Sequence, residues 1–247
     1  MDDVAISVKT KSSVERWKRM GYTNVCTTNT DLIKTHGRGI VFLVVKPHVR
    51  MAVFKELDSN SFVDTPLIVS VMNGVDVNTL ESEVSLKGYP SNCGLVRLMT
   101  NLSTSVCAGA SVFCTSSFLQ QKKIDVIMCL MQYTGICLKI DENAFNAATA
   151  IAGCAPAFIF LAIEALADGG VLGGIDRSTS IKLATQAVMG AAKMVANLKK
   201  HPAVLKDEVC SAGGSTIYGV KELEKKGFRS ALIEAVHTST QRSSGLI

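Results

Sequence analysis

The sequence has few aromatic residues and no pattern that would hold a metal ion. Phe, Trp and Tyr make up 6% of the 247 residues. The eight cysteines form no C-x-x-C pair, and no histidines stand at zinc-ligand spacing. We therefore expect neither a zinc site nor a disulfide framework. The net charge is only +5, and no basic stripe with interleaved aromatics is present, which argues against a nucleic-acid partner.

The chain also lacks a recognisable sorting signal. MDDVAISV has neither the basic start and apolar stretch of a secretory signal nor the Arg/Ser-rich helix of a transit peptide. Cysteines such as Cys114 and Cys129 lie in apolar runs, where a thiol behaves as a small buried hydrophobe. Both observations suit a reducing compartment, so we expect a cytoplasmic protein. A content of 47% hydrophobic and 19% charged residues indicates a globular chain.

What is present, over residues 1–140, is an alternation of two patterns. Short apolar runs bounded by polar segments predict strands at 4–8, 40–45, 67–72, 95–99, 111–114 and 136–140. Helical spacing predicts helices between them at 13–20, 49–57, 75–84 and 118–133. Such alternation is typical of an α/β fold with a mainly parallel, Rossmann-like sheet covered on both faces. This is the architecture of a nucleotide-binding domain.

From residue 141 to 247 the strands stop. Glycines and prolines separate helical segments at 142–152, 155–172, 177–198, 202–210, 215–226 and 229–244, which predicts an all-α second domain. Residues 147–163 carry no charge, but they are fewer than the roughly 20 residues that a bilayer core requires. We interpret them as a helix buried at a subunit interface and expect no membrane partner.

A glycine-rich turn, SAGGSTI at 211–217, precedes the most informative of these helices. Ile217, Val220 and Leu223 recur at helical spacing, so the glycines stand where a helix begins. Glycine lets backbone N–H groups point at one place, and a helix start favours an anion. The turn therefore predicts a site for a carboxylate or phosphate, with the Thr216 hydroxyl at its edge. The alternative is a plain loop in which Ser215 is only an N-cap.

The order of segments from Gly153 to Arg229 resembles the C-terminal half of pyrroline-5-carboxylate reductase. The segments are GCAPAFIFLAIEALADGGV, QAVMGAAKM, HPAVLKDEV and SAGGSTIYGV. The resemblance implies NAD(P)H-dependent reduction of 1-pyrroline-5-carboxylate to L-proline, the last step of proline biosynthesis. It also implies a homodimer or a ring of dimers in which these helices interlace between subunits.

The resemblance assigns roles to the residues of the turn. Backbone N–H groups would hold the substrate carboxylate, and a serine would line the same pocket. The N–H groups are those of Gly213, Gly214 and Ser215, and the serine is Ser211. Thr216 would hydrogen-bond the ring nitrogen and steer its protonation. In this turn Ala212 stands where the family usually has proline.

The resemblance places the cofactor at the ends of the predicted strands. In a dinucleotide fold the end of the second strand meets the adenosine ribose, where a basic residue accepts the extra phosphate of NADP. That segment here contains Lys9, Thr10 and Lys11 and no acid, which favours NADPH over NADH. LVVKPH resembles the family's A-V-K-P strand end and supplies Val44, Val45, Lys46 and Pro47. Met72 and Asn73 complete the cofactor set, and Asn73 stands where the family usually has alanine.

The sequence has no G-x-G-x-x-G/A motif, in which glycines let a pyrophosphate approach a helix start. Relative to the family pattern, the first strand, the glycine loop and the first helix are expected to be absent, about one strand–helix unit. Three alternatives therefore stay open: a non-catalytic, dimer-forming paralogue, an incomplete gene model of this reductase, and a different reductase of the same architecture that acts on a 2-hydroxy or imino acid. A mitochondrial location stays open for the same reason.

Overall fold

The computed structural model describes residues 3–245, which form two compact units. The first consists of residues 3–153 together with 240–245, and the second of residues 154–239. The sequence predicted a boundary at residue 141. The first unit extends further because helix α6 (Glu142–Thr149) buries Phe145 in the same core as the strands.

The strands of the first unit form two sheets. β1 (Ala5–Ser7) and β2 (Asn24–Cys26) make a parallel pair. The second sheet has the order β3-β4-β5-β6-β7 and is parallel except between β5 and β6. Its strands are β3 (Ile40–Leu43), β4 (Leu67–Ser70), β5 (Leu95–Met99), β6 (Gly109–Thr115) and β7 (Gly135–Lys139). The sheet is therefore mainly parallel, as the sequence predicted.

The break between the two sheets lies at an informative position. The doubly wound dinucleotide fold has the strand order 3-2-1-4-5-6. β2 and β1 correspond to the third and second strands of that order, and β3, β4 and β5 to the fourth, fifth and sixth. The first strand would lie between β1 and β3, and this is where the described strands are not paired. Residues 3–245 thus hold no strand at this position.

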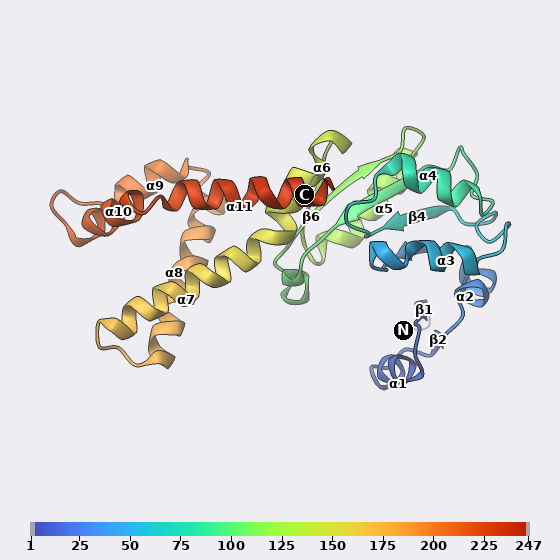
Figure 1. The fold of residues 1–247 in the computed structure, drawn as a ribbon, viewed down its shortest axis with the longest axis horizontal. Coiled ribbons are helices and arrows are strands. Elements are labelled where there is room, and N and C mark those ends of the chain that lie inside the picture. Colours follow the sequence, from blue (N-terminus) through green and yellow to red (C-terminus); the bar gives the residue numbers. More distant parts are fainter. Residues whose placement is uncertain (1–2, 246–247) are drawn as a thin grey trace. The chain divides into compact units, whose positions relative to one another are not determined.

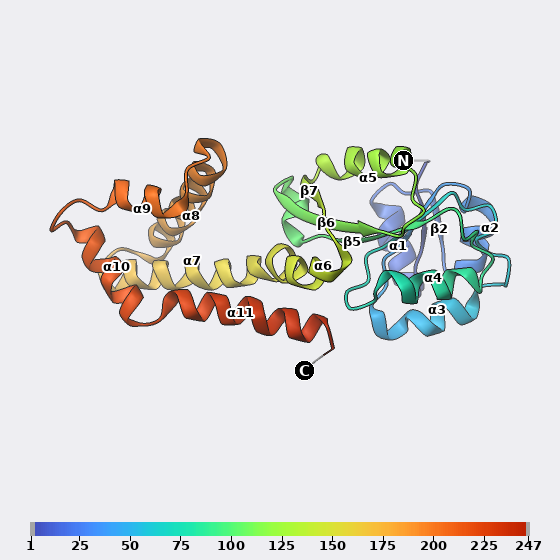
Figure 2. The same ribbon diagram turned by 90° about the horizontal axis from the view of Figure 1, so that it is seen from above.

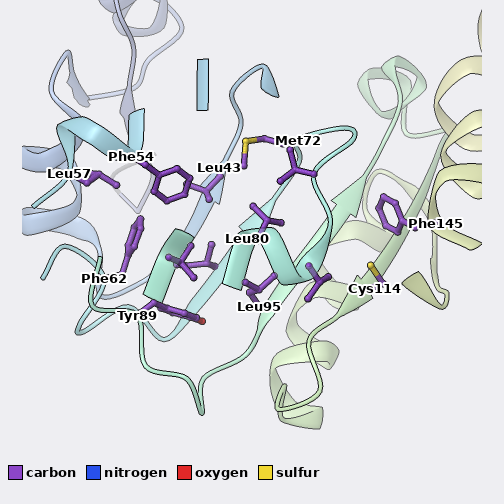
Figure 3. Packing of buried hydrophobic residues seen from close by; sticks show 14 of the residues in the cluster. Leu43, Phe54, Leu57, Phe62, Met72, Leu80, Tyr89, Leu95, Cys114 and Phe145 are labelled. Carbon is purple, nitrogen blue, oxygen red and sulfur yellow. The ribbon is translucent and has the colours of Figure 1, made fainter. Parts of the chain in front are cut away.

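Helices cover both faces of the five-stranded sheet, as Figure 2 shows. One face packs against α3 (Arg50–Glu56), α4 (Val77–Ser85) and α6, through a cluster that includes Phe54, Leu80 and Phe145 (Figure 3). The other face packs against α5 (Gln121–Gln132), which contributes Ile124 and Ile127. Neighbouring residues of β4 enter opposite clusters because strand side chains alternate between faces.

Smaller elements connect these layers. They are α1 (Lys11–Arg19), α2 (Asn29–His36), and the 3₁₀ turns η1 (Pro47–Val49) and η2 (Leu102–Val106). β2 and α2 were not predicted from the sequence. β2 has three residues, and α2 is mostly polar, so neither carries a clear apolar period.

The second unit is all helical, as predicted, and Figure 1 shows its helices in yellow to red. They are α7 (Ala155–Leu172), α8 (Arg177–Leu198), α9 (Pro202–Val209), α10 (Ser215–Lys225) and α11 (Phe228–Ser243), whose end belongs to the first unit. α7 and α8 pack closely at Gly170, because a Cβ there would lie only 2.6 Å from the Ser180 hydroxyl. A π-helical segment, η3 (Ala150–Cys154), joins α6 to α7. Asn101 Nδ2 donates to the Ala152 carbonyl in it at 2.7 Å.

The uncharged stretch at 147–163 is helical, but only its first part, which includes Ala150 and Ala152, is buried within one chain. Phe160 is 62% exposed and Leu161 is 66% exposed. The run Glu142–Leu172, with a mean hydropathy of 2.0 in its most apolar window, is long and apolar enough to cross a membrane by length and composition alone. One such helix is weak evidence for a membrane span. A helix that is covered by a second subunit would also have an apolar surface of this kind.

Candidate active site

The glycine-rich turn at 211–214 has a defined backbone geometry. The Gly214 N–H donates to the Ser211 carbonyl at 3.1 Å, and Gly213 has a φ of 67°. A hydrogen-bonded turn with a positive φ at its third residue fits type II, which requires glycine there and favours proline at the second residue. Ala212 holds that second position. The family's proline would pre-order the turn, and alanine leaves it looser.

Helix α10 begins directly after this turn with unpaired donors. Its N-cap is Gly214, which offers no side-chain acceptor, so the alternative of Ser215 as N-cap is wrong. The first N–H groups of a helix have no partner inside it. Those of Ser215 and Thr216, and that of Gly213 before them, have no acceptor in the described residues. These N–H groups lie at an exposed helix start, and free N–H groups at a helix start are able to bind a carboxylate.

Gly214 contributes in a different way from the prediction. Its N–H is engaged within the turn and is not available to a ligand. The Ser211 side chain instead occupies the space where a Cβ on residue 214 would lie, so only glycine allows the serine this position. Ser211 therefore sits against the turn, and Thr216 is exposed one residue into the helix. The structure brings Ser211, Gly213, Ser215 and Thr216 together.

The cofactor residues predicted after β3 and β4 lie at one edge of the sheet. β3 and β4 are adjacent and parallel, and the Val71 N–H donates to the Leu43 carbonyl at 3.1 Å. Val44, Val45, Lys46 and Pro47 thus share an edge with Met72 and Asn73. Lys46 is exposed there, and Pro47 begins η1. Met72 as a whole residue is only 2% exposed and packs in the core, and its N–H donates to Ser70 Oγ at 3.3 Å.

Lys9 and Thr10 lie at the end of β1, in the separate two-stranded sheet. Thr10 Oγ1 accepts from the Ser13 N–H at 3.2 Å and caps α1. Lys9 and Lys11 are exposed and have no ion-pair partner within residues 3–245. Unpaired cationic side chains suit the 2′-phosphate of NADPH.

These residues fit the two ends of a dinucleotide. A buried Asn73 Oδ1 without a hydrogen-bond partner in the described residues also suits a polar ligand group near the end of β4. The pyrophosphate between the two ends would need the glycine turn that follows the first strand, and this strand is the one missing between β1 and β3 in the described residues.

A buried charge network, not predicted from the sequence, supports the sheet next to this site. Arg97 of β5 is 2% exposed and donates to Glu142 Oε1 at 2.5 Å and to Asn146 Oδ1 at 3.0 Å. Its guanidinium lies 4.0 Å from the centroid of the Phe145 ring. The sequence feature that could have indicated this network is the single arginine inside the apolar run LVRLM, because a buried charge requires a partner.

The Cys114 thiol belongs to the same network and donates to Glu142 Oε2 at 2.6 Å. Burial, followed by the hydrogen bond and the charge of Glu142, raises the pKa of Cys114 well above its usual range. The thiol therefore stays protonated at neutral pH and is a poor nucleophile. The thiol serves as a hydrogen-bond donor to the Glu142 carboxylate.

Comparison with known proteins agrees with this geometry. A family profile described as pyrroline-5-carboxylate reductase dimerisation matches residues 142–246. The pyrroline-5-carboxylate reductase of Arabidopsis thaliana is 40% identical over 223 residues, which is 90% of this chain and 78% of the relative. The chain belongs to the pyrroline-5-carboxylate reductase family. The human pyrroline-5-carboxylate reductase 2 is 36% identical over 95% of this chain and 71% of its own length.

Solved structures of pyrroline-5-carboxylate reductases share the fold. That of Plasmodium falciparum, determined with NADP bound, is 28% identical and has a TM-score of 0.80 over 90% of this chain and 81% of its own. That of Coxiella burnetii is 25% identical, with a TM-score of 0.85 over 99% of this chain and 88% of its own. The α/β sheet followed by a helical domain is therefore the architecture of this family.

Proposed function

We propose that the protein is a pyrroline-5-carboxylate reductase, which uses NADPH or NADH to reduce 1-pyrroline-5-carboxylate to L-proline as the last step of proline biosynthesis. The observation that carries the proposal is the start of α10, where free N–H groups and two hydroxyls surround a tight glycine turn. This turn lies inside the region that matches the family profile. The relatives at 36–40% identity bear the name of this activity.

The residues of the turn perform the binding and proton chemistry of the reaction. The N–H groups of Gly213, Ser215 and Thr216 hold the substrate carboxylate, aided by the positive end of the α10 dipole. The Thr216 hydroxyl hydrogen-bonds the ring nitrogen and steers its protonation. A protonated imine accepts hydride more readily than a neutral one, so this contact lowers the barrier. The nicotinamide cofactor supplies the hydride.

The charge at the end of β1 supports NADPH over NADH. Lys9 and Lys11 are exposed and unpaired in the described residues, and no acid stands in the loop between β1 and α1 to select an unphosphorylated ribose. All eight cysteines are free, which supports a reducing location such as the cytoplasm.

One observation favours a second candidate function. The helical unit that the dimerisation profile matches and the carboxylate turn are both present in the described residues, and neither by itself supplies the hydride. A non-catalytic paralogue that forms dimers through its helices would have this combination of features. Binding of NADPH decides between the two candidates.

Replacing Thr216 by alanine should lower kcat/KM for 1-pyrroline-5-carboxylate by about 10- to 100-fold, as expected for the loss of a hydrogen bond to a charged group. The side chain is exposed and makes no hydrogen bond in the described residues, so the fold should not change. Steady-state kinetics measure the effect. Thr216→Ser keeps the hydroxyl and should stay within a few-fold of the parent. Equal kinetics for the alanine variant would remove Thr216 from the mechanism.

The protein should form an obligate dimer or a larger ring of dimers. The large apolar side chains exposed on α7, α8 and α11 include Phe160, Leu161, Leu172, Leu183 and Ile233, and water disfavours such a surface. The family profile for dimerisation covers these helices. Sedimentation at micromolar concentration checks the prediction. A single 26.3 kDa species without detergent would contradict it, and a need for detergent would favour the membrane alternative.

A further inference from the structure

The end of α11 returns to the first unit and contacts it at two places. Asn146 Nδ2 donates to Ser244 Oγ at 3.0 Å. Asn73 Nδ2 donates to Ser243 Oγ at 3.5 Å, which is at the long end of the hydrogen-bond range. We call Ser243–Ser244 the C-terminal turn. It therefore touches both helix α6 and the loop that follows β4.

Backbone packing at Gly74 accompanies the second of these contacts. A Cβ added to Gly74 would lie 3.4 Å from the Ser243 carbonyl oxygen, so the backbone of the loop packs directly against the turn. Gly74 also has a φ of 72°, a backbone conformation that residues other than glycine rarely adopt. The loop therefore packs on the C-terminal turn at a residue whose backbone conformation favours glycine.

The first contact anchors the C-terminal turn to a rigid part of the core. Asn146, which holds Ser244, accepts a hydrogen bond from the buried Arg97 at 3.0 Å. Arg97 is fixed in turn by its bond to Glu142 and by its position in the central strand β5. Because Asn146 fixes the C-terminal turn to the core, the turn can hold the loop after β4 in one conformation.

The β4 loop occupies a position that matters for hydride transfer. In the doubly wound fold the second group of strands binds the second mononucleotide of the cofactor, which is the nicotinamide half. β3, β4 and β5 form that group here, and Asn73 and Gly74 follow the carboxyl end of β4. A shift of this loop would displace the ring that carries the hydride.

We propose that Ser243 and Asn73 are positioning residues: the C-terminal turn braces the loop at Asn73–Gly74 in the conformation that receives the nicotinamide half of the cofactor. The proposal rests on the proposed function for the identity of the cofactor.

Hydrogen exchange tests the brace without cofactor or activity. In Ser243→Ala the amides of residues 71–77 should exchange at least about 3-fold faster, in line with the loss of one hydrogen bond and its packing. Thr238→Ala is the matched control, because Thr238 is exposed on the same helix and its side chain makes no hydrogen bond within residues 3–245. Equal exchange of this loop in the two variants would overturn the proposal.

A double-mutant cycle on NADPH binding tests the positioning role. Asn73→Ala and Ser243→Ala should each raise the Kd for NADPH by about 3- to 10-fold, and the double variant should be no weaker than the weaker single variant. KM for the imine should stay unchanged, because its carboxylate binds elsewhere. Additive effects, or none, would overturn the role even where the exchange result supports the brace. A parent chain without measurable NADPH binding would contradict the proposed function, while hydrogen exchange would still decide the brace.

Discussion

A form of the chain extended by a strand, a glycine-rich loop and a helix ahead of β1 should bind NADPH about 10²–10³-fold more tightly than the 247-residue chain. Within residues 3–245, β1 and β3 are not paired with each other, and the first strand of the doubly wound order would lie between them. The loop after that strand and the dipole of the helix behind it normally hold the pyrophosphate. In the extended form they would add a contact between the two ends of the cofactor.

The measurement is a fluorescence titration of NADPH on the two proteins side by side. The added segment would have about 27 residues, the length of one strand–helix unit with its loop. A third protein, in which the loop glycines are replaced by valine, is the control. It fills the sheet but keeps the backbone away from the phosphates, so it separates repair of the sheet from repair of the phosphate site.

Proline formation should return together with NADPH binding in the extended protein. Equal affinity in the short and extended proteins, with turnover of 1-pyrroline-5-carboxylate by the short one, would show that the glycine loop is dispensable here. An extended protein that binds NADPH but makes no proline would instead favour the non-catalytic paralogue.

Glu142→Ala should destabilise the fold by about 3–5 kcal/mol, the cost of leaving a buried charge without its partner. The Arg97 side chain is 2% exposed and that of Glu142 is 36% exposed, so removal of the carboxylate leaves a guanidinium that is still largely shielded from water. Asn146 and the face of Phe145 would be its remaining partners. The Cys114 thiol would lose its acceptor as well. Thermal unfolding followed by circular dichroism should show a fall in Tm on the order of 10 °C.

Glu208→Ala is the matched control for this variant. Glu208 pairs with Lys200 at 2.5 Å, but both side chains are 47% exposed, and exposed pairs contribute about 0–1 kcal/mol. Its Tm should therefore stay close to that of the parent. A fall in Tm for Glu142→Ala no larger than for Glu208→Ala would mean that the core relaxes and lets water reach Arg97.

The parts of the fold that the sequence predicted are those with a long apolar period. α8 and α10 were expected at 177–198 and 215–226 and run from Arg177 to Leu198 and from Ser215 to Lys225. β2 escaped prediction because three residues form a strand only when a neighbour pairs with them, which is a tertiary effect. The antiparallel pairing of β5 and β6 is equally a matter of chain topology and leaves no mark in either strand.

The candidate site likewise has features that the sequence predicts and features that depend on tertiary structure. The glycines and the helix start of the substrate turn could be located from the sequence, because a positive φ and an uncapped helix have residue signatures. The sequence could not show which N–H groups are free. The hydrogen bond from the Gly214 N–H to the Ser211 carbonyl depends on how the turn closes. Asn73 contacts Ser243, which is 170 positions away in the sequence, and Arg97 contacts Glu142, which is 45 positions away. No local pattern reveals contacts over such separations.

The segment of β1, α1 and β2 has a consequence for how unfolding is observed. No residue from 3 to 30 is buried, so this segment has little packing to hold it and should open before the rest of the first unit. Trp17, the one tryptophan of the sequence, lies in α1 and packs edge-on against Tyr22 with ring centroids 5.2 Å apart. Intrinsic tryptophan emission is therefore a local probe that reports fraying of this segment, while the five-stranded sheet and the helices melt without an optical signal from Trp17.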